Sequence, residues 1–348
     1  MMLLDDWVRS KIGKYPIHGL SLAVADRGEV SRVYTYGFSD VRRRRGVTPS
    51  TLFQAASISK PVAATAAMIG GAQRRELALD APIARALPDW RVCNPFDEPV
   101  TLRRLMAHTS GMVGDRYGTD DPNRPLPSAA AQIGDPCFPS TIVREPGSAY
   151  VYSPHGYAVL QAAMERSYAE PFARTMRRLV LEPFGMASST FEPVSAEVAD
   201  GSVALPYDSE AFDRGEQRPI SNPPPAYRAL ASGGLWTTPS DLARFLSGFQ
   251  TALSGSPIGD LTPELAAEMV GCELGFTANV GRGFRRCFGH TGHNAGYLSL
   301  MLGSVDCRKG VVIMTNSGPP MEFSGEYRAF HFINELAEFL IEQAGWAE

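Results

Sequence analysis

Apolar and polar positions form strand-like runs near both ends of the 348-residue chain. Such runs, separated by turn residues, are typical of β-strands. Short connections such as Asp26-Arg27-Gly28 favour antiparallel pairing of neighbouring strands in one sheet. The pattern predicts strands at Gly19 to Ala25, Val30 to Phe38, Leu52 to Ala55, Arg286 to His290, Tyr297 to Val305 and Gly310 to Asn316.

Between and outside these strands, apolar residues recur with the period of a helix. Thr101 and Ser240 are suitable N-caps, and Gly111 can end the first of the capped helices. Residues 112–150 and 192–230 are rich in Gly, Pro, Asp and Ser and indicate two long surface excursions. We expect helices at 3–13, Thr101 to Gly111, Tyr157 to Arg166, Pro171 to Val180 and Ser240 to Phe249, and a C-terminal helix with Phe330, Ile333, Ala337, Leu340, Ile341 and Ala344 on its apolar face.

Strands at both ends with helices between them predict an α+β fold. We expect an α/β body with a central antiparallel sheet flanked by helices, formed by residues 1–72 and 272–348. Residues 73–271 would form a mainly helical inserted subdomain with long loops. A cleft between two such subdomains is a usual place for a ligand site.

The first candidate site lies where the third predicted strand leads into an alanine-rich helix. Proline is tolerated only in the first turn of a helix, so Pro61 places the start of this helix near Ser57. Ser57 and Lys60 are then on one helical face, and residues 61–72 carry no charge. A lysine in dry surroundings has a lowered pKa and can take the proton of a serine nucleophile. The same spacing also occurs by chance, with the serine as a helix cap and the lysine in solvent.

Composition narrows the classes of function. Hydrophobic residues make up 44% of the chain and charged residues 20%, as in an ordinary globular protein, and the net charge is −4. This charge gives no general attraction to nucleic acid or acidic membranes. The five cysteines contain no Cys-x-x-Cys pair, so neither a disulfide framework nor a zinc site is indicated. The first residues lack the basic and apolar regions of a secretory signal, and no run is long enough to span a membrane, so we expect a cytoplasmic location.

Two further polar clusters stand far from Ser57 in the sequence. Tyr152-Ser153-Pro154-His155 joins the first excursion to a helix, and residues 289–296, which include His290-Thr291-Gly292-His293, are expected to interrupt the C-terminal strands. Together with Ser57 and Lys60, these clusters could converge on the cleft.

In this order the three clusters resemble the signature elements of the serine β-lactamase and penicillin-binding-protein superfamily. The chain is most similar to class C β-lactamases with their esterase and D-aminopeptidase relatives. The resemblance runs from about residue 15 to residue 317. Supporting stretches are Leu105 to Gly111, Pro146-Gly147, Leu181 to Met186, Gly233 to Pro239 and Ile313 to Asn316.

The resemblance implies a role for each element. Ser57 would be the acylated nucleophile, Lys60 its base and Tyr152 a proton relay. The backbone N–H groups of Ser57 and His293 would form the oxyanion hole, and His290, Thr291 and Gly292 would bind substrate.

Two positions depart from the lactamase pattern. Pro154 stands in place of an asparagine and offers no side-chain hydrogen bond, and His290 stands in place of a lysine. A histidine is a hydrogen-bonding group more than a fixed cation near neutral pH, which weakens recognition of a substrate carboxylate. Both changes favour the esterases and aminopeptidases. His155 either substitutes for the lost polar group in substrate binding or is a loop residue.

Other candidate sites are weaker. His290 and His293 have no acidic or sulfur ligand nearby in the sequence, and a serine–lysine mechanism needs no metal, so we expect no metal or cofactor. His108 and Ser110 are interpreted as structural residues at a helix end. The chain has no Gly-x-Ser-x-Gly elbow of the α/β-hydrolases.

The sequence therefore predicts a serine hydrolase that forms an acyl-enzyme on a carboxylic ester. Its partner would be a small-molecule ester or amide, with no nucleic acid and no membrane. The alternatives are a D-aminopeptidase, amidase or β-lactamase of the same family, an acyltransferase, and a catalytically silent binding protein.

Overall fold

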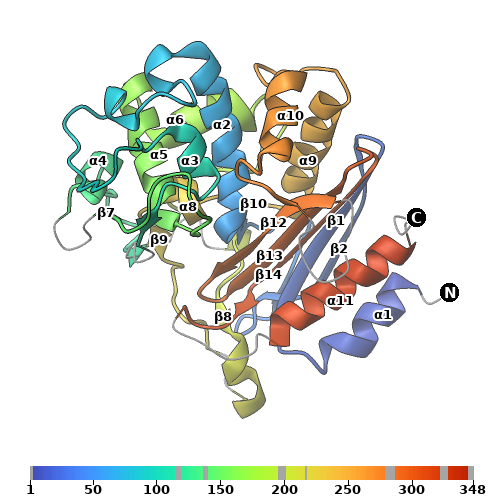
Figure 1. The fold of residues 1–348 in the computed structure, drawn as a ribbon. Helices are drawn as coiled ribbons and strands as arrows, with labels where there is room; N and C mark the ends of the chain where they lie inside the picture. Colours follow the sequence, from blue (N-terminus) through green and yellow to red (C-terminus); the bar gives the residue numbers. More distant parts are fainter. Residues whose placement is uncertain are drawn as a thin grey trace.

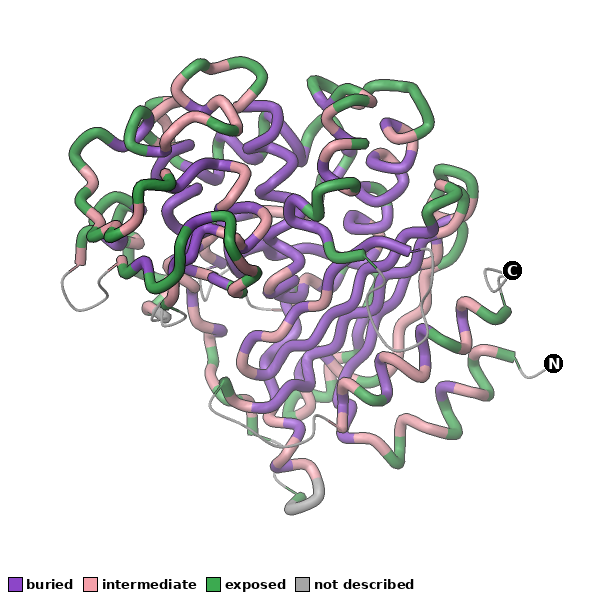
Figure 2. The backbone as a smooth tube through the Cα atoms, in the orientation of Figure 1, coloured by how far each residue is buried: buried purple, intermediate pink, exposed green. Residues whose placement is uncertain are grey.

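The structure is a computed structural model that describes residues 3–114, 119–135, 140–194, 201–215, 218–278, 287–321 and 328–343 (Figure 1). A central antiparallel sheet carries helices on both faces, and further helices and loops extend to one side. The predicted α+β class is thus confirmed. Figure 2 shows that the strands in the middle of the sheet are buried, whereas most exposed segments lie at the periphery.

The central sheet brings together strands from both ends of the chain. β1 lies between β2 and β14, and Leu22 in β1 pairs with Ile313 in β14. The predicted strands near both termini therefore do form one antiparallel sheet. Its order is β11 (Thr277–Ala278), β12 (Cys287–Asn294), β13 (Tyr297–Ser304), β14 (Lys309–Thr315), β1 (Gly19–Asp26), β2 (Glu29–Asp40) and β3 (Arg45–Gly46).

Residues Leu52 to Ala55 are not part of this sheet, contrary to the prediction. They contain β4 (Phe53–Gln54), which pairs with β10 (Trp236–Thr237). The Ala55 N–H donates to the Leu235 carbonyl, and the Leu52 N–H donates to that of Ser202. The backbone groups of this segment are thus satisfied by residues far away in the sequence, which a local pattern does not reveal.

The third polar cluster also differs from its prediction, because it does not interrupt the strands. β12 continues through it, with His290 opposite Met301 and Asn294 opposite Tyr297. The reversal comes only at Gly296, whose φ of 80° suits the turn. The predicted start of this strand, Arg286, lies outside the described residues.

The two faces of the sheet pack against different helices. In β1, Leu20 and Leu22 belong to the hydrophobic core between the sheet and α1 and α11. Ala23 and Ala25 belong to the core on the opposite face, which includes α9 (Pro239–Leu253). This is the alternation expected of a strand buried on both sides. Figure 1 shows α1 (Leu4–Ile12) and α11 (Arg328–Gln343) side by side on one face.

Most predicted helices are confirmed, although some ends differ. Thr101 caps α3 (Leu102–Met106) by accepting a hydrogen bond from the Arg104 N–H, but the helix ends before Gly111, because His108 takes a left-handed φ of 56°. Thr238 caps α9 instead of Ser240, since Pro239 occupies the first helical position. The remaining helices are α2 (Ser59–Gln73), α4 (Ala129–Ile133), α5 (Pro154–Tyr168), α6 (Phe172–Met176), α8 (Leu230–Gly233), α9 (Pro239–Leu253) and α10 (Pro263–Gly271).

Short elements complete the described part of the chain. Four are 3₁₀ turns, η1 (Ala56–Ile58), η2 (Arg75–Leu77), η3 (Ile83–Arg85) and η5 (Ser209–Arg214), and η4 (Arg177–Leu181) is a π-helical turn that continues α6. The short strand pairs are β5 (Met112–Val113) with β7 (Thr141–Ile142), β6 (Thr119–Asp120) with β9 (Ala226–Tyr227), and β8 (Tyr207–Asp208) with β15 (Ser317–Gly318).

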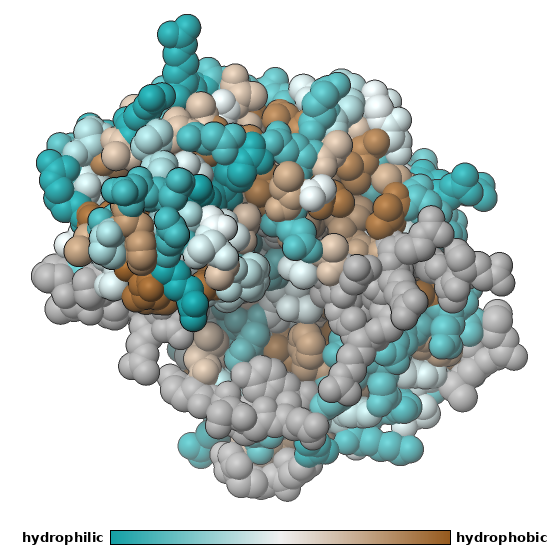
Figure 3. Space-filling model, viewed as in Figure 1, coloured by the Kyte–Doolittle hydropathy of each residue, from teal (hydrophilic) through white to brown (hydrophobic). Residues whose placement is uncertain are grey.

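α9 belongs to the segment expected as the helical insertion, yet it packs on β1 and β14. The division into residues 1–72 with 272–348 and residues 73–271 stays a prediction. No helix in the described ranges has both the length and the apolar character that crossing a membrane requires. In Figure 3, polar residues cover most of the helical part, and the apolar areas between them are small.

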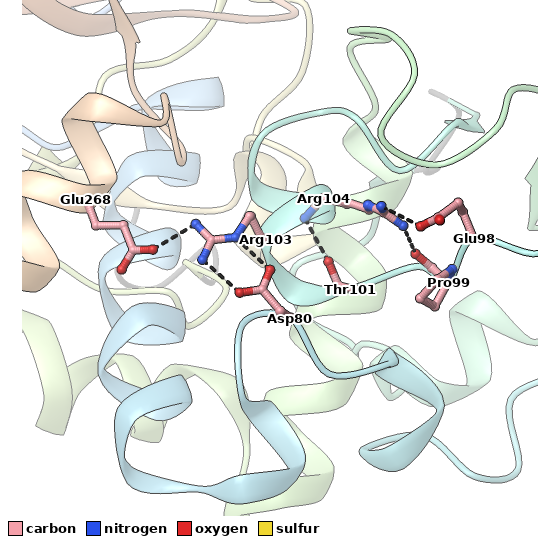
Figure 4. A network of polar contacts seen from close by, with 7 residues as sticks. All are labelled: Asp80, Glu98, Pro99, Thr101, Arg103, Arg104 and Glu268. Carbon is pink, nitrogen blue, oxygen red and sulfur yellow. Dashed lines mark hydrogen bonds and ion pairs between the residues drawn. The ribbon is translucent and has the colours of Figure 1, made fainter.

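Two arginines of α3 join parts of the helical region (Figure 4). Arg103 binds Asp80 through two hydrogen bonds of 2.7 and 2.9 Å and reaches Glu268 of α10 at 2.8 Å. Arg104 donates to Glu98 at 2.7 Å and to the Pro99 carbonyl at 2.6 Å, and it leaves no room for a side chain at Gly147, on the segment that leads to Tyr152. α3 is therefore joined to α10 on one side and to the Glu98–Pro99 segment on the other.

Candidate active site

Ser57 lies in the short 3₁₀ turn η1, directly before α2. The preceding residue, Ala56, has a φ of 49°, a left-handed conformation that costs a non-glycine residue about 1 kcal/mol or more. Neighbouring strands hold this turn, since Ser299 Oγ of β13 donates to the Ala55 carbonyl at 2.8 Å. The sheet thus stabilises the strained backbone of this turn. Ser57 is partly exposed, whereas Ala56 and Ile58 on either side of it are buried.

Lys60 is buried beside Ser57, with 1% of its surface exposed. Its Nζ lies 3.0 Å from Ser57 Oγ and donates to the Ser232 carbonyl of α8 at 2.9 Å. No carboxylate of the described residues pairs with it. Desolvation without a compensating anion lowers the pKa of Lys60 to about 7. A substantial fraction is therefore neutral near neutral pH, and a neutral amine can accept the Ser57 proton.

Tyr152 approaches Ser57 from the other side. Its hydroxyl donates to Ser57 Oγ at 2.9 Å, and Lys60 Nζ lies 4.9 Å from its ring centroid. Although 42% of the residue is exposed, the loss of water around it raises the pKa of Tyr152 to about 12, while its hydrogen bond with Ser57 opposes the rise. Tyr152 is therefore a protonated donor at all ordinary pH values.

The residues after Tyr152 begin α5. Ser153 Oγ accepts a hydrogen bond from the Gly156 N–H at 3.1 Å, and Pro154 occupies the first turn of the helix. A proline there loses no helical hydrogen bond, because the first N–H groups of a helix have no partner within it. Pro154 is thus compatible with the start of α5, the helix that directly follows Tyr152.

The third cluster lies along β12, next to the Ser57 turn. A side chain at Gly292 would overlap the Ala55 carbonyl and Ser299 Oγ, so glycine is required for this close approach. The His290 ring centroid lies 6.4 Å from that of Tyr152. Burial and then the charge of Lys60 lower the pKa of His290 to about 4, so its side chain is neutral at pH 7. The structure thus brings the three polar clusters together.

A model of the family named "Beta-lactamase" matches residues 4–332. The chain belongs to the β-lactamase family. The superfamily resemblance carried by the motifs is confirmed.

Two curated proteins are similar to parts of the chain. Esterase EstB of Burkholderia gladioli is 34% identical over 212 residues, which are 54% of this chain and 50% of that protein. Protein Rv1367c of Mycobacterium tuberculosis is 29% identical over 255 residues, which are 66% of this chain and 61% of that protein. The chain thus spans between half and two thirds of the length of these relatives.

Solved structures support the fold. The octameric penicillin-binding protein homologue from Pyrococcus abyssi has a TM-score of 0.72 at 23% identity and covers 97% of this chain and 76% of its own. A β-lactamase/D-alanine carboxypeptidase from Yersinia pestis, complexed with citrate, has a TM-score of 0.69 at 19% identity and covers 96% of this chain and 99% of its own. At these identities the likeness establishes the fold of the β-lactamase family.

His155 lies deeper, in the first turn of α5. Its Nε2 is 2.6 Å from Ser140 Oγ, and its ring packs on Gly114, so it joins α5 to the first excursion. Burial lowers its pKa to about 4. Substrate binding by His155 stays a prediction. Substrate binding by Thr291 and the oxyanion-hole role of the His293 backbone N–H also stay predictions. The side chain of His293 lies with Nε2 3.0 Å from the Pro319 carbonyl.

The sequence indicates a structural role for His108, but it does not reveal the contact of His108 with Tyr152. The two ring centroids are 4.4 Å apart, and His108 Nδ1 accepts a hydrogen bond from the Ser153 N–H at 3.0 Å. Burial, and then the charges of Lys60 and His290, lower the pKa of His108 to about 2. A neutral His108 therefore supports the Tyr152 segment. Its left-handed φ is not visible in the sequence, although its place in the Leu105 to Gly111 stretch was a signal.

The described residues contain no group of three His, Cys, Asp or Glu side chains that could hold a metal ion. His290 and His293 are three positions apart on β12, so their side chains point to opposite faces of the sheet.

Proposed function

We propose that the chain is a serine hydrolase that acts through an acyl-enzyme on a carboxylic ester. The observation that carries the proposal is the position of Ser57 Oγ, within 3.0 Å of Lys60 Nζ and 2.9 Å of the Tyr152 hydroxyl. A nucleophile, a base of suitable pKa and a protonated donor are thus in mutual contact. Because the chain spans only part of its curated relatives, their activities are not transferred to it directly.

The proposed reaction begins when neutral Lys60 Nζ takes the Ser57 proton and Oγ attacks the ester carbonyl carbon. The backbone N–H groups of Ser57 and His293 would stabilise the oxyanion of the tetrahedral intermediate. When the C–O bond breaks, the leaving alkoxide receives the proton that Lys60 took, relayed through the Tyr152 hydroxyl. Water then attacks the acyl-enzyme by the same route in reverse, and the acid and free Ser57 are released.

A fluorophosphonate probe should phosphonylate Ser57 and add the mass of one probe molecule. We expect intact-protein mass spectrometry to show this adduct in the parent chain and in Ser50→Ala, and no adduct in Ser57→Ala. Ser50 is a suitable control because it is exposed and lies only seven positions away. Peptide mapping of the adduct to Ser59 or Ser110 would contradict the assignment.

Ester hydrolysis is favoured over β-lactam hydrolysis by Pro154 and His290. Pro154 has no side-chain group to hold a lactam amide, and neutral His290 offers no fixed charge to a cephalosporin carboxylate. We expect kcat/KM for a short-chain p-nitrophenyl ester to exceed that for a chromogenic cephalosporin by about 100-fold or more. Similar values for the two substrates would show that these two positions do not set the preference.

Amide hydrolysis and acyl transfer use the same nucleophile. The first would be recognised by turnover of D-amino acid amides, and the second by faster ester consumption and a new ester product when an alcohol is added. The close contacts of Ser57, Lys60 and Tyr152 weigh against a catalytically silent binding protein.

A further inference from the structure

A cavity of about 440 Å³ lies next to the end of β2, away from Ser57. This volume is within the range of small-molecule sites. α1, the end of β2, the turn after it and η5 enclose it. The described residues that line it are Arg9, Ile12, Ile17, His18, Tyr36, Gly37, Phe38, Val41, Arg44 and Phe212.

This cavity is separate from the proposed active site. Ser57 contacts the sheet at β12, whereas the cavity is bounded by β2, and β13, β14 and β1 lie between them. At ~4.8 Å for each inter-strand step, the two strands are roughly 19 Å apart. The proposed chemistry at Ser57 uses no residue of the cavity.

His18 supplies a ring nitrogen, Nε2, that has no hydrogen-bond partner among the described residues. The residue is 94% buried, with 6% of its surface exposed, and Nε2 makes no hydrogen bond to the described residues. On the other side of the ring, Nδ1 is 2.9 Å from Ser317 Oγ, which also accepts a hydrogen bond from the His18 backbone N–H. When that hydroxyl, which already accepts from the backbone N–H, donates its proton to Nδ1, the ring proton is on Nε2. A buried N–H donor then borders the cavity.

The ring of His18 is held in this orientation by its neighbours. It stacks on Tyr207 with centroids 4.5 Å apart and meets the edge of Phe212 at 5.2 Å. Burial lowers the pKa of His18 to about 4, so the ring is neutral at pH 7. The neighbours therefore fix the orientation of the His18 ring without any contact from the cavity side. A buried N–H donor without a hydrogen bond lowers the stability of the fold, and a ligand that accepts a hydrogen bond from it would remove this cost.

The charged residues at the cavity are both cations. Arg9 of α1 and Arg44 of the turn are exposed at its rim, and neither forms an ion pair with any described residue. No acidic side chain is among the described residues that line the cavity. Asp5 of α1, which is not part of the lining, accepts a hydrogen bond from the Tyr36 hydroxyl at 2.5 Å.

The rest of the lining is apolar. Ile12, Ile17, Phe38, Val41 and Phe212 provide aliphatic and aromatic walls. A ligand that satisfies this lining has one anionic acceptor group and an apolar body. A bare inorganic anion would leave the walls uncovered, and a neutral hydrocarbon would leave the His18 donor and both arginines without an acceptor.

We propose that this cavity is a second ligand site, which binds a small organic carboxylate with an apolar or aromatic body. The carboxylate accepts hydrogen bonds from His18 Nε2 and from the guanidinium groups of Arg9 and Arg44. The apolar body packs between α1 and Phe212. Arginine is suited to this task because its planar donors match the two carboxylate oxygens.

Calorimetric titration of the full chain with 3-phenylpropionate tests the proposal. We expect saturable binding in the parent chain, and binding weakened at least about 10-fold in the double variant Arg9→Gln, Arg44→Gln, since two charge-assisted contacts are lost. Arg85→Gln is the matched control, because Arg85 is an exposed arginine on η3, outside the cavity. It should bind like the parent.

Two further titrations test the ligand class and the histidine. Acetate and 3-phenylpropionamide should each bind at least about 10-fold more weakly than 3-phenylpropionate, since one lacks the apolar body and the other the charge. His18→Phe keeps a flat ring and should lose affinity similarly, with thermal unfolding as the check of its fold. Unchanged binding in the double arginine variant, no saturation below about 10 mM, or equal affinity for acetate would each overturn the proposal. Binding at the Ser57 site would not respond to the arginine variants.

Discussion

Lys60→Met should lower kcat/KM for an activated ester by about 10⁴-fold or more, a loss as large as that of Ser57→Ala. General-base assistance alone is typically worth ~10²- to 10⁴-fold, and groups that act as a unit lose nearly all of their joint effect when one is removed. Lys60 Nζ is the described basic group that contacts Ser57 Oγ, at 3.0 Å. Without it the hydroxyl keeps its proton and is a poor nucleophile.

Two companion variants distinguish a base from a positive charge. Lys60→Arg should not restore turnover, because a guanidinium does not give up its proton at any usable pH. Lys11→Met is the control, since Lys11 is a partly exposed lysine on α1 that pairs with Glu335. Steady-state kinetics with circular dichroism would show whether rate is lost while the fold is kept. Near-normal turnover in Lys60→Arg would make Lys60 an electrostatic support and move the base elsewhere.

Tyr152→Phe should lower kcat/KM by about 10²- to 10⁴-fold, because the leaving alkoxide loses its proton relay. The exposed neighbour Tyr150 gives a matched control, and Tyr150→Phe should keep most of the activity. A Tyr152→Phe variant within a few-fold of the parent would exclude the relay. Single-turnover measurement of acyl-enzyme formation and decay would show which step is slowed.

The pH profile of the parent chain follows from the same pair of residues. The active form of Lys60 is the neutral amine, so kcat/KM should rise with pH through a limb near pH 7, where the pKa of Lys60 lies. Tyr152, with a pKa of about 12, keeps its proton and gives no falling limb below about pH 10. The two groups are in contact, so the limb belongs to the coupled pair. A profile that falls between about pH 6 and about pH 9 would contradict a neutral lysine base.

Local sequence patterns were sufficient for the strands of the central sheet and for the Ser57–Lys60 contact. The apolar runs of β1 and β14, the turn residues that bound them and the position of Pro61 reflect short-range geometry, which a sequence displays directly. The convergence of Tyr152 and His290 on Ser57 came from the family motifs, and the contacts now described agree with it.

Features that depend on tertiary contacts were not accessible in this way. β4 pairs with β10, whose residues lie about 180 positions later, and no local pattern reports such a partner. His108 contacts the Tyr152 segment because its backbone has a left-handed φ, which is rare for a residue other than glycine. The cavity at His18 is formed by four segments that come together only in the folded chain.

A ribosome-bound chain cannot complete this sheet while most of it is being made. Leu20 of β1 pairs with Thr315 of β14, so about 295 residues separate two adjacent positions of the sheet. At ~5–20 residues per second, β1 and β2 wait roughly 15 to 60 s for their neighbour, as a hairpin that is only marginally stable in water. During that time Leu20 and Leu22 are uncovered, and the β1 edge is open to pairing with other chains. The nascent protein is therefore a natural client for chaperones until the segment from β12 to α11 has emerged.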